Sequence, residues 1–253
     1  MKLLISGEGS SDLGACNNAQ GQCSDEFFDP GPMTVWLARL WESSHNYNLL
    51  DFPEAVLFVS ETALEQQSKR EGKDKVKRMQ LLRGKDKPVE TGVHFNNARQ
   101  LGLMAKQLAA DAKTPVMAVF FRDTDGTRSA PGQLWQTKWD SILNGFSAAA
   151  FDFGVPMLPK PKSEAWLLCA GKTARHSHEG LEAISGNDDS PHSAKTQLDE
   201  FFGSHQAAHQ LADWCQENPA DWSNLLTMPS FKKFFARFQE VATSLLRPKG
   251  AAA

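Results

Sequence analysis

The fold class is decided by residues 115–125, which read PVMAVFFRDTD. The first part, from Pro115 to Phe121, is an unbroken apolar run rich in β-branched and aromatic side chains. Such a run is typical of a strand buried on both faces of a sheet. The charged residues that follow at once, Arg122, Asp123 and Asp125, indicate that the chain leaves the sheet at a polar turn.

Outward from this strand, apolar stretches and helical patterns alternate. Further strands are predicted at residues 2–6, 55–59 and 151–158. Apolar residues at helical spacing predict helices from Pro32 onward, at 96–112 and at 134–146. This alternation, up to about residue 160, implies an α/β fold with a mostly parallel sheet of about four strands flanked by helices.

The remaining segments read as loops and helices. Residues 15–32 and 178–193 are rich in Gly, Asn, Asp or Ser and are expected to be loops. Helical patterns follow at residues 194–202, 206–216 and 231–246. We therefore expect three parts: an α/β domain, a helical extension packed on it, and a disordered tail, at residues 1–170, 171–247 and 248–253.

The composition is that of a globular protein, and the net charge of −3 means that any basic surface must be local. With no apolar run of about 18 residues and no signal peptide, a cytoplasmic protein without membrane contact is expected. The four cysteines, at Cys16, Cys23, Cys169 and Cys215, form no C-x-x-C pair and are expected to be reduced thiols. A metal-binding pair of Cys16 and Cys23 is the alternative.

Acidic residues follow three of the predicted strands. Glu8 comes after the first, Asp123 and Asp125 after the third, and Glu164 after the fourth. In parallel sheets, sites form outside the carboxyl ends of the strands, so these side chains are expected to meet. Taken singly, each could be an ordinary turn or helix-start residue. Gathered carboxylates repel one another, and Mg²⁺ or Mn²⁺ would compensate their charge.

Three motifs in this order resemble those of the Toprim-like nucleases. They are GEGSSD at residues 7–12, the apolar strand with Asp123-x-Asp125, and PKSEAWLL at residues 161–168. The chain is most similar to small stand-alone proteins related to RloB and to the Toprim domain of OLD-type (overcoming lysogenization defect) nucleases. The SFKKF segment at residues 230–234 is similar to a C-terminal motif of the small proteins.

The resemblance implies a Toprim-like fold and metal-dependent phosphodiester hydrolysis of nucleic acid. The implied metal ligands are Glu8, Asp12, Asp123, Asp125 and Glu164, with acid–base chemistry also for Glu8. Ser163 belongs to the same motif, although the OLD pattern places one residue between its Ser and Glu. The family's catalytic lysine is matched to Lys195, with Lys232 as the alternative.

The resemblance also implies a bacterial antiviral role. A separately encoded ATPase is the implied partner, because no G-x-x-x-x-G-K-[ST] motif occurs in this chain. A second interpretation is therefore a non-catalytic or partner-activated subunit of an ATPase complex. The sequence leaves open whether the chain forms a homo-oligomer.

The stretch DTDGT at residues 123–127 also matches the signature of haloacid-dehalogenase-like phosphatases, in which the first aspartate accepts the phosphoryl group. Asn187-Asp188-Asp189 would then stand for the later metal-binding acids of that family. This interpretation is less favoured, because that fold needs several further strands and the sequence offers one.

Two sets of basic residues are candidates for nucleic-acid binding. The tract at residues 69–87 carries nine basic and three acidic residues and is either a solvated surface or a phosphate-contacting arm. The candidates within it are Lys73, Lys75, Lys77 and Arg78. The residues that flank the acidic centre, and are expected to hold phosphate, are Arg122, Arg128, Lys160 and Lys162.

Overall fold

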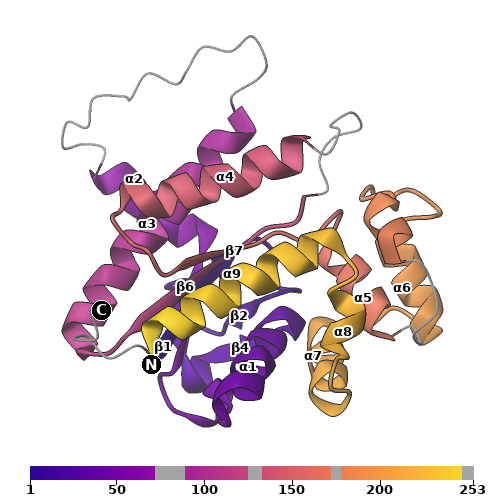
Figure 1. Cartoon of the computed structure of the whole chain (residues 1–253), viewed down its shortest axis with the longest axis horizontal. Helices are drawn as coiled ribbons and strands as arrows, with labels where there is room; N and C mark the ends of the chain where they lie inside the picture. The colour runs from indigo at the N-terminus through magenta and orange to yellow at the C-terminus, as the bar shows by residue number, and fades with distance from the viewer. Residues whose placement is uncertain (72–88, 125–132, 172–177, 247–253) are drawn as a thin grey trace.

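The computed structural model describes residues 1–71, 89–124, 133–171 and 178–246. At its centre lies a five-stranded sheet in the order β3-β5-β1-β6-β7 (Figure 1). Strands β5, β1, β6 and β7 are parallel, and β3 pairs antiparallel with β5. The strands span Lys2–Gly7 (β1), Gln22–Ser24 (β3), Val56–Ser60 (β5), Val116–Phe121 (β6) and Gly154–Met157 (β7). The predicted α/β class is confirmed, and this sheet has five strands where about four were expected.

The prediction of a loop over residues 15–32 is wrong. This segment contains three short strands, β2 (Gly14–Cys16), β3 and β4 (Phe28–Pro30), and the 3₁₀ helix η1 (Asp25–Phe27). β2 and β4 pair with each other in a small second sheet, while β3 is held by β5. The pairing of β3 with the distant β5 is a partnership that the local composition does not reveal.

A disulfide bond in the same segment corrects the expectation of free thiols there. Cys16 of β2 and Cys23 of β3 are bonded, with their Cα atoms 5.6 Å apart. The bond joins the small sheet to the edge strand of the large one. Cys169 and Cys215 are free and buried, and burial raises the pKa of the Cys215 thiol to about 12.

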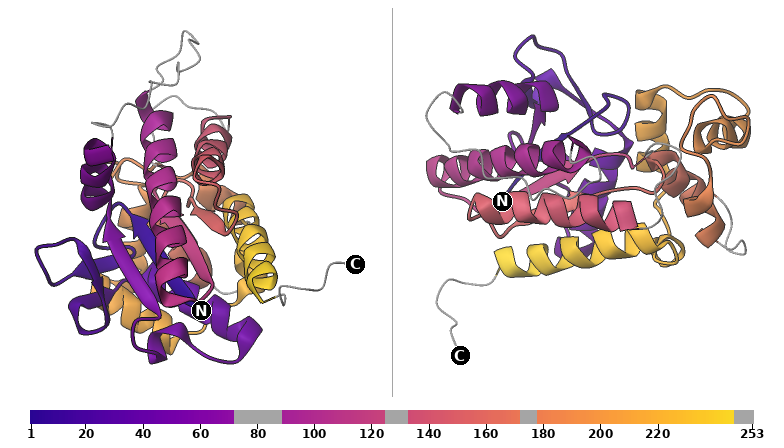
Figure 2. Two further views of the ribbon diagram at one scale, coloured as in Figure 1. Left: turned by 90° about the vertical axis from the view of Figure 1, so that its left-hand side faces the viewer. Right: turned by 90° about the horizontal axis from the view of Figure 1, so that it is seen from above.

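Helices cover both faces of the large sheet (Figures 1 and 2). On one face lie α2 (Glu61–Glu71), α3 (Val89–Ala112) and α4 (Gln133–Ala148). There α3 packs on β1 and β6, and α4 on β7. On the opposite side lies α1 (Pro32–His45), followed by the 3₁₀ helix η2 (Leu49–Asp51). Helices on both faces are what crossover connections between parallel strands produce.

Beyond β7 the described chain is helical, as predicted. The elements are α5 (Ser163–Gly171), η3 (His178–Ala183), α6 (Ala194–Phe202), α7 (Ala208–Glu217), α8 (Trp222–Leu225) and α9 (Pro229–Leu245). The 3₁₀ helix η3 occupies part of the stretch 178–193 that was expected to be a loop. The division of the chain at residue 170 stays a prediction, and the tail at 248–253 lies outside the described residues. None of the helices in the described ranges is long and apolar enough to cross a membrane.

The last helix, α9, packs on the large sheet and contributes to the hydrophobic core. It packs along β6 and β7, and its buried Phe231, Phe234 and Phe238 recur at helical spacing. The Phe231 ring lies edge-on to Trp36 of α1 and Trp166 of α5, with centroids 6.2 and 5.0 Å apart. Burying each such ring contributes on the order of 2–3 kcal/mol to the free energy of folding, so α9 is an integral part of the core.

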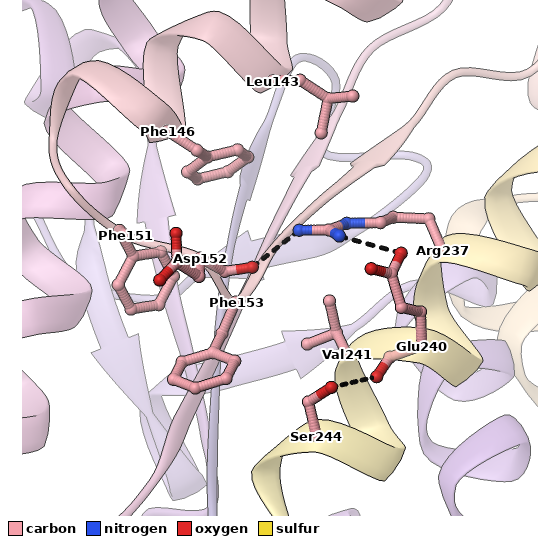
Figure 3. Close-up of a pocket in the computed structure, with 9 residues that line it drawn as sticks. All are labelled: Leu143, Phe146, Phe151, Asp152, Phe153, Arg237, Glu240, Val241 and Ser244. Atoms are coloured by element: carbon pink, nitrogen blue, oxygen red, sulfur yellow. Dashed lines mark hydrogen bonds and ion pairs between the residues drawn. The ribbon is translucent and has the colours of Figure 1, made fainter.

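A pocket of about 330 Å³ lies between α4, the turn before β7 and α9 (Figure 3). Arg237 of α9 donates from Nε to the Gly154 carbonyl at 3.0 Å and from Nη2 to the Asp152 carbonyl at 2.6 Å. The Phe153 carbonyl, which lies between these two in the chain, accepts a hydrogen bond from Ala118 of the neighbouring strand β6. Backbone carbonyls alternate in direction along a strand, so the carbonyls of Asp152 and Gly154 face the free edge of β7. Arg237 therefore covers this edge, at the amino end of β7.

Candidate carboxylate site at the sheet edge

The register of three parallel strands brings their ends level at one edge of the sheet. Gly7 of β1 lies between Ser60 of β5 and Phe121 of β6. The residues that leave the sheet next are Glu8, Glu61 and Arg122. From β1 the chain continues to β5 on one side, and from β6 to β7 on the other. The site therefore lies at a topological switch point, where open α/β sheets bind ligands.

Close packing of the two central strands requires glycine at position 7. A Cβ atom there would lie 2.4 Å from the carbonyl oxygen of Phe121 in β6. Glycine lets the backbones of β1 and β6 approach at the point where Glu8 leaves the sheet.

Arg122 joins two carboxylates that directly follow the neighbouring strands β1 and β5. Its Nη2 lies 3.1 Å from Oε2 of Glu8, and its Nη1 lies 3.2 Å from Oε1 of Glu61. The same oxygen of Glu61 accepts a hydrogen bond from Asn97 of α3, at 3.2 Å. Asn97 is 2% exposed, so the Glu61 end of this network is fixed by the core. Burial raises the pKa of Glu61, and the Arg122 guanidinium opposes that effect.

A second group of carboxylates is organised by Ser163, the first residue of α5. The Ser163 hydroxyl donates to Oδ1 of Asp12, and its backbone N–H donates to Oδ1 of Asp123 at 3.0 Å. Ser163 is 2% exposed, so this bridge is withdrawn from solvent. The neighbouring Glu164 carboxylate lies 3.5 Å from the same hydroxyl. One serine thus joins two of the predicted metal ligands and contacts a third.

Backbone hydrogen bonds fix the segments that carry both aspartates. The Asp12 carbonyl accepts from the N–H of Met33, in the first turn of α1, at 3.0 Å. In the loop after β6, Thr124 donates its N–H to the Pro161 carbonyl at 3.0 Å and its hydroxyl to the Pro159 carbonyl at 2.6 Å. These bonds tie the Asp123 loop to the segment that leads into α5.

Crowding perturbs the ionisation of the carboxylates. Burial raises the pKa of Asp12 from 3.8 to about 6, with the Ser163 hydrogen bond opposing and repulsion from Glu164 and Glu8 adding to the rise. Burial, together with repulsion from Asp12 and Glu164, raises the pKa of Asp123 well above its ordinary value. Burial also raises the pKa of Glu164. Carboxylates that hinder each other's ionisation in this way are stabilised as anions by a nearby cation.

The donor set suits a hard cation such as Mg²⁺ or Mn²⁺, because it consists of carboxylate oxygens. Four of the five predicted ligands, Glu8, Asp12, Asp123 and Glu164, lie close enough to affect one another electrostatically. Asp125 lies outside the described residues. Within the described ranges, no group of three or more His, Cys, Asp or Glu side chains is already arranged to hold an ion.

The predicted basic residues take different positions. Lys162 forms an ion pair with Asp188 at 2.8 Å, and both Lys162 and Lys195 lie near enough to Glu164 to oppose the rise of its pKa. Lys232 is exposed on α9. The candidates outside the described residues are Arg128, Lys73, Lys75, Lys77 and Arg78.

The SFKKF segment at the start of α9 has packing roles. Ser230 accepts a hydrogen bond at 2.9 Å from the Trp166 indole of α5. The Lys233 ammonium lies 5.4 and 5.0 Å from the ring centroids of Trp135 and Trp139 in α4. The segment therefore fastens α9 to both α4 and α5.

Two residues of the site were not identified from the sequence. Glu61 directly follows β5, so the rule that selected Glu8 at the end of β1 would also have selected Glu61. Asn97 lies on the buried side of α3, and no sequence signal distinguishes it from other polar residues of that helix. Its role depends on how α3 packs against the sheet edge.

The phosphatase interpretation finds little support in the topology. After Asp123, the described ranges contain one further strand of the sheet, β7, and then helices. The several later strands that the haloacid-dehalogenase fold requires are not found there.

Neither a scan against models of protein families nor searches of curated proteins and solved structures gives a match to this chain.

Proposed function

We propose that the chain is a metal-dependent phosphodiesterase that acts on nucleic acid. The observation that supports this most strongly is the Ser163 bridge between Asp12 and Asp123, with Glu8 and Glu164 beside it. These residues come from the three motifs that resemble the Toprim-like nucleases. Their meeting at a topological switch point is what a site for a ligand requires.

The residues that would hold Mg²⁺ or Mn²⁺ are Asp12, Asp123, Glu164, Glu8 and Asp125. When bound, such an ion polarises a phosphate oxygen and activates water. The raised pKa values of Asp12 and Asp123 support this assignment, because a nearby positive charge favours their ionised forms.

The chain's own groups position these ligands. Ser163 fixes one oxygen of Asp12 and one oxygen of Asp123, so neither carboxylate rotates freely. Glu8 has a side chain that is 34% exposed, so water and substrate can reach it. We assign proton transfer to Glu8. Lys195, near Glu164, supplies positive charge at the edge of the cluster.

Nucleic acid is the proposed substrate because basic side chains lie beside the carboxylates: Arg122 at Glu8, and Lys162 and Lys195 near Glu164. Lys160 is partly exposed in the segment that leads into α5, and it makes no hydrogen bond or ion pair with the described part of the chain. The charged tract at residues 69–87, of which residues 72–87 lie outside the described residues, carries nine basic residues against three acidic ones. Phosphate contacts of this kind bind nucleic acid without regard to its sequence.

The test is cation-dependent cleavage of single- and double-stranded DNA and RNA. We expect Glu8→Gln to slow cleavage about 10²–10⁴-fold and Asp123→Asn to abolish it. Lys113→Gln, on the exposed turn before β6 at the opposite end of the sheet, is the matched control. Hydrolysis of a small phosphomonoester without cleavage of any nucleic acid would instead favour the phosphatase.

One observation favours a second candidate, a subunit activated by a separately encoded ATPase in an antiviral system. Arg122 engages Glu8 in this structure, so one predicted metal ligand already has a counter-ion. Cleavage that begins only when the ATPase is added would support this candidate.

A further inference from the structure

Arg122 holds two carboxylates through separate nitrogens, and only one of the two belongs to the predicted metal set. Nη2 faces Glu8 and Nη1 faces Glu61. We propose that a cation binding at Glu8 displaces Arg122 from that carboxylate, and that Arg122, still held by Glu61, then binds a phosphate of the substrate. This inference rests on the proposed function and adds the residues that couple cation binding to phosphate binding.

Burial decides which of the two ion pairs is released. The Glu61 side chain is 17% exposed and is also bonded to the buried Asn97. The Glu8 side chain is twice as exposed, at 34%. An ion pair contributes less stability the more it is exposed to solvent, whereas one anchored by a buried hydrogen bond is held more firmly. The Glu8 end is therefore the one that opens.

Electrostatics supplies the reason for opening. A divalent ion at Glu8 and a guanidinium 3.1 Å from the same carboxylate repel each other within a few ångströms. The released Nη2 carries two N–H donors, and a guanidinium matches phosphate oxygens in charge and geometry. Arg122 also directly precedes Asp123, so its freed end stays beside the proposed metal site.

Cation affinity measured without nucleic acid tests the first half of the proposal. Mn²⁺ binding is followed by electron paramagnetic resonance of the free ion. Arg122→Gln should bind Mn²⁺ about tenfold more tightly than wild type, because the competing charge is gone. Glu61→Gln should bind it severalfold more weakly, because Arg122 then belongs to Glu8 alone. Arg122→Lys keeps the charge and should stay near wild type.

Binding of a labelled oligothymidylate tests the second half, with Ca²⁺ in place of Mn²⁺ to limit turnover. In wild type, the cation should tighten oligonucleotide binding severalfold. In Arg122→Gln this coupling should disappear, although the cation binds more tightly. Coupling that persists undiminished in the variant would show that Arg122 does not receive the phosphate.

The outcomes separate this inference from the proposed function. Equal Mn²⁺ affinity of wild type, Arg122→Gln and Glu61→Gln overturns the inference and leaves the proposed function standing. A wild-type chain that binds no Mn²⁺ overturns both. Thermal unfolding verifies that each variant is folded, and if Arg122→Gln is not, Glu61→Gln decides the first half alone.

Discussion

At the scale of single residues, Ser163 determines how the candidate site is built. It uses its hydroxyl for Asp12 and its backbone N–H for Asp123, so a change of side chain removes the Asp12 bond and the 3.5 Å contact with Glu164 but not the Asp123 bond. Ser163→Ala should therefore leave the Asp123 contact in place and leave the Asp12 carboxylate held only by the exposed Ser11 hydroxyl. Groups that orient metal ligands in this way typically change metal affinity 10–100-fold when they are lost.

We expect Ser163→Ala to weaken Mn²⁺ binding by about 10-fold or more. Ser11→Ala is the matched control, because the Ser11 hydroxyl donates to the other oxygen of Asp12, at 3.1 Å, from an exposed position. Exposed hydrogen bonds hold a side chain less firmly than buried ones, so the Mn²⁺ affinity of this variant should stay within a few-fold of wild type. A titration in which both variants lose affinity equally would show that burial of the Ser163 bridge has no special role.

The perturbed pKa of Asp12 makes a prediction for the cation-free protein. Its folded-state pKa of about 6 lies above its ordinary value of 3.8, so between these pH values the folded chain binds more protons than the unfolded chain. Stability should therefore fall as pH rises through this interval, by on the order of 1–3 kcal/mol from Asp12. Asp12→Asn removes this dependence, because the amide does not ionise.

Thermal unfolding in EDTA checks this prediction. Asp12→Asn should unfold a few degrees above wild type at a pH of about 8 and show no gain at a pH of about 3.5. Added Mg²⁺ should stabilise wild type and leave the variant unchanged. A variant less stable than wild type at both pH values would mean that the carboxylate is needed for folding, contrary to the prediction.

At the scale of elements, the edge strand β7 depends on a helix that follows it by more than seventy residues. Arg237 of α9 supplies hydrogen bonds to two β7-edge carbonyls, at Asp152 and Gly154. Arg237→Met keeps the apolar stem and removes both bonds, which should lower the free energy of unfolding by about 1–3 kcal/mol. An uncovered edge strand also favours association between chains.

Urea unfolding measures this effect. Glu240→Gln is the control, because the Glu240 carboxylate pairs with Arg237 at 2.9 Å and, as an acceptor, cannot bond to the two carbonyls. Its side chain is 64% exposed, so its loss should change stability little. Similar midpoints for the two variants would mean that water replaces Arg237 at the strand edge.

Elements with strong periodicity were predictable from the sequence, and elements made by pairing were not. The strands β1, β5 and β6 could be predicted, because strands buried on both faces of a parallel sheet appear in the sequence as nearly continuous apolar runs. The strands β2 (GAC), β3 (QCS) and β4 (FDP) are only three residues long, too short to show a strand pattern, and they form by pairing with their partner strands. The disulfide between β2 and β3 was missed for the same reason.

The same distinction applies to the site. Glu8, Asp123 and Glu164 were found because strand ends can be read along the chain. The ion pair of Arg122 with Glu61 was missed because it depends on register, which is a relation between β5, β1 and β6. Asn97 requires in addition the packing of α3.

At the scale of the whole molecule, the two ends of the sheet differ in chemistry. The carboxyl end gathers Glu8, Asp12, Asp123 and Glu164. At the amino end of β7, Arg237 covers the strand edge beside a pocket lined by both aromatic and charged side chains (Figure 3). With a net charge of only −3, the chain has no overall attraction for nucleic acid, so binding and chemistry should reside in separate groups.

The last prediction separates these groups. Changing Lys75 and Lys77 of the charged tract to Gln should weaken nucleic-acid binding. It should also reduce the slope of log affinity against log salt concentration by up to about 2, because fewer counterions are released when fewer phosphates are contacted. Lys113→Gln with Lys106→Gln removes the same charge from exposed sites on other elements and should change the slope little. Asp123→Asn should instead abolish turnover and bind as tightly as wild type or more so, because it loses a charge that repels phosphate. If the two double variants show the same slope, the tract is a solvated surface, and the binding surface should be sought near Lys160 and Lys162.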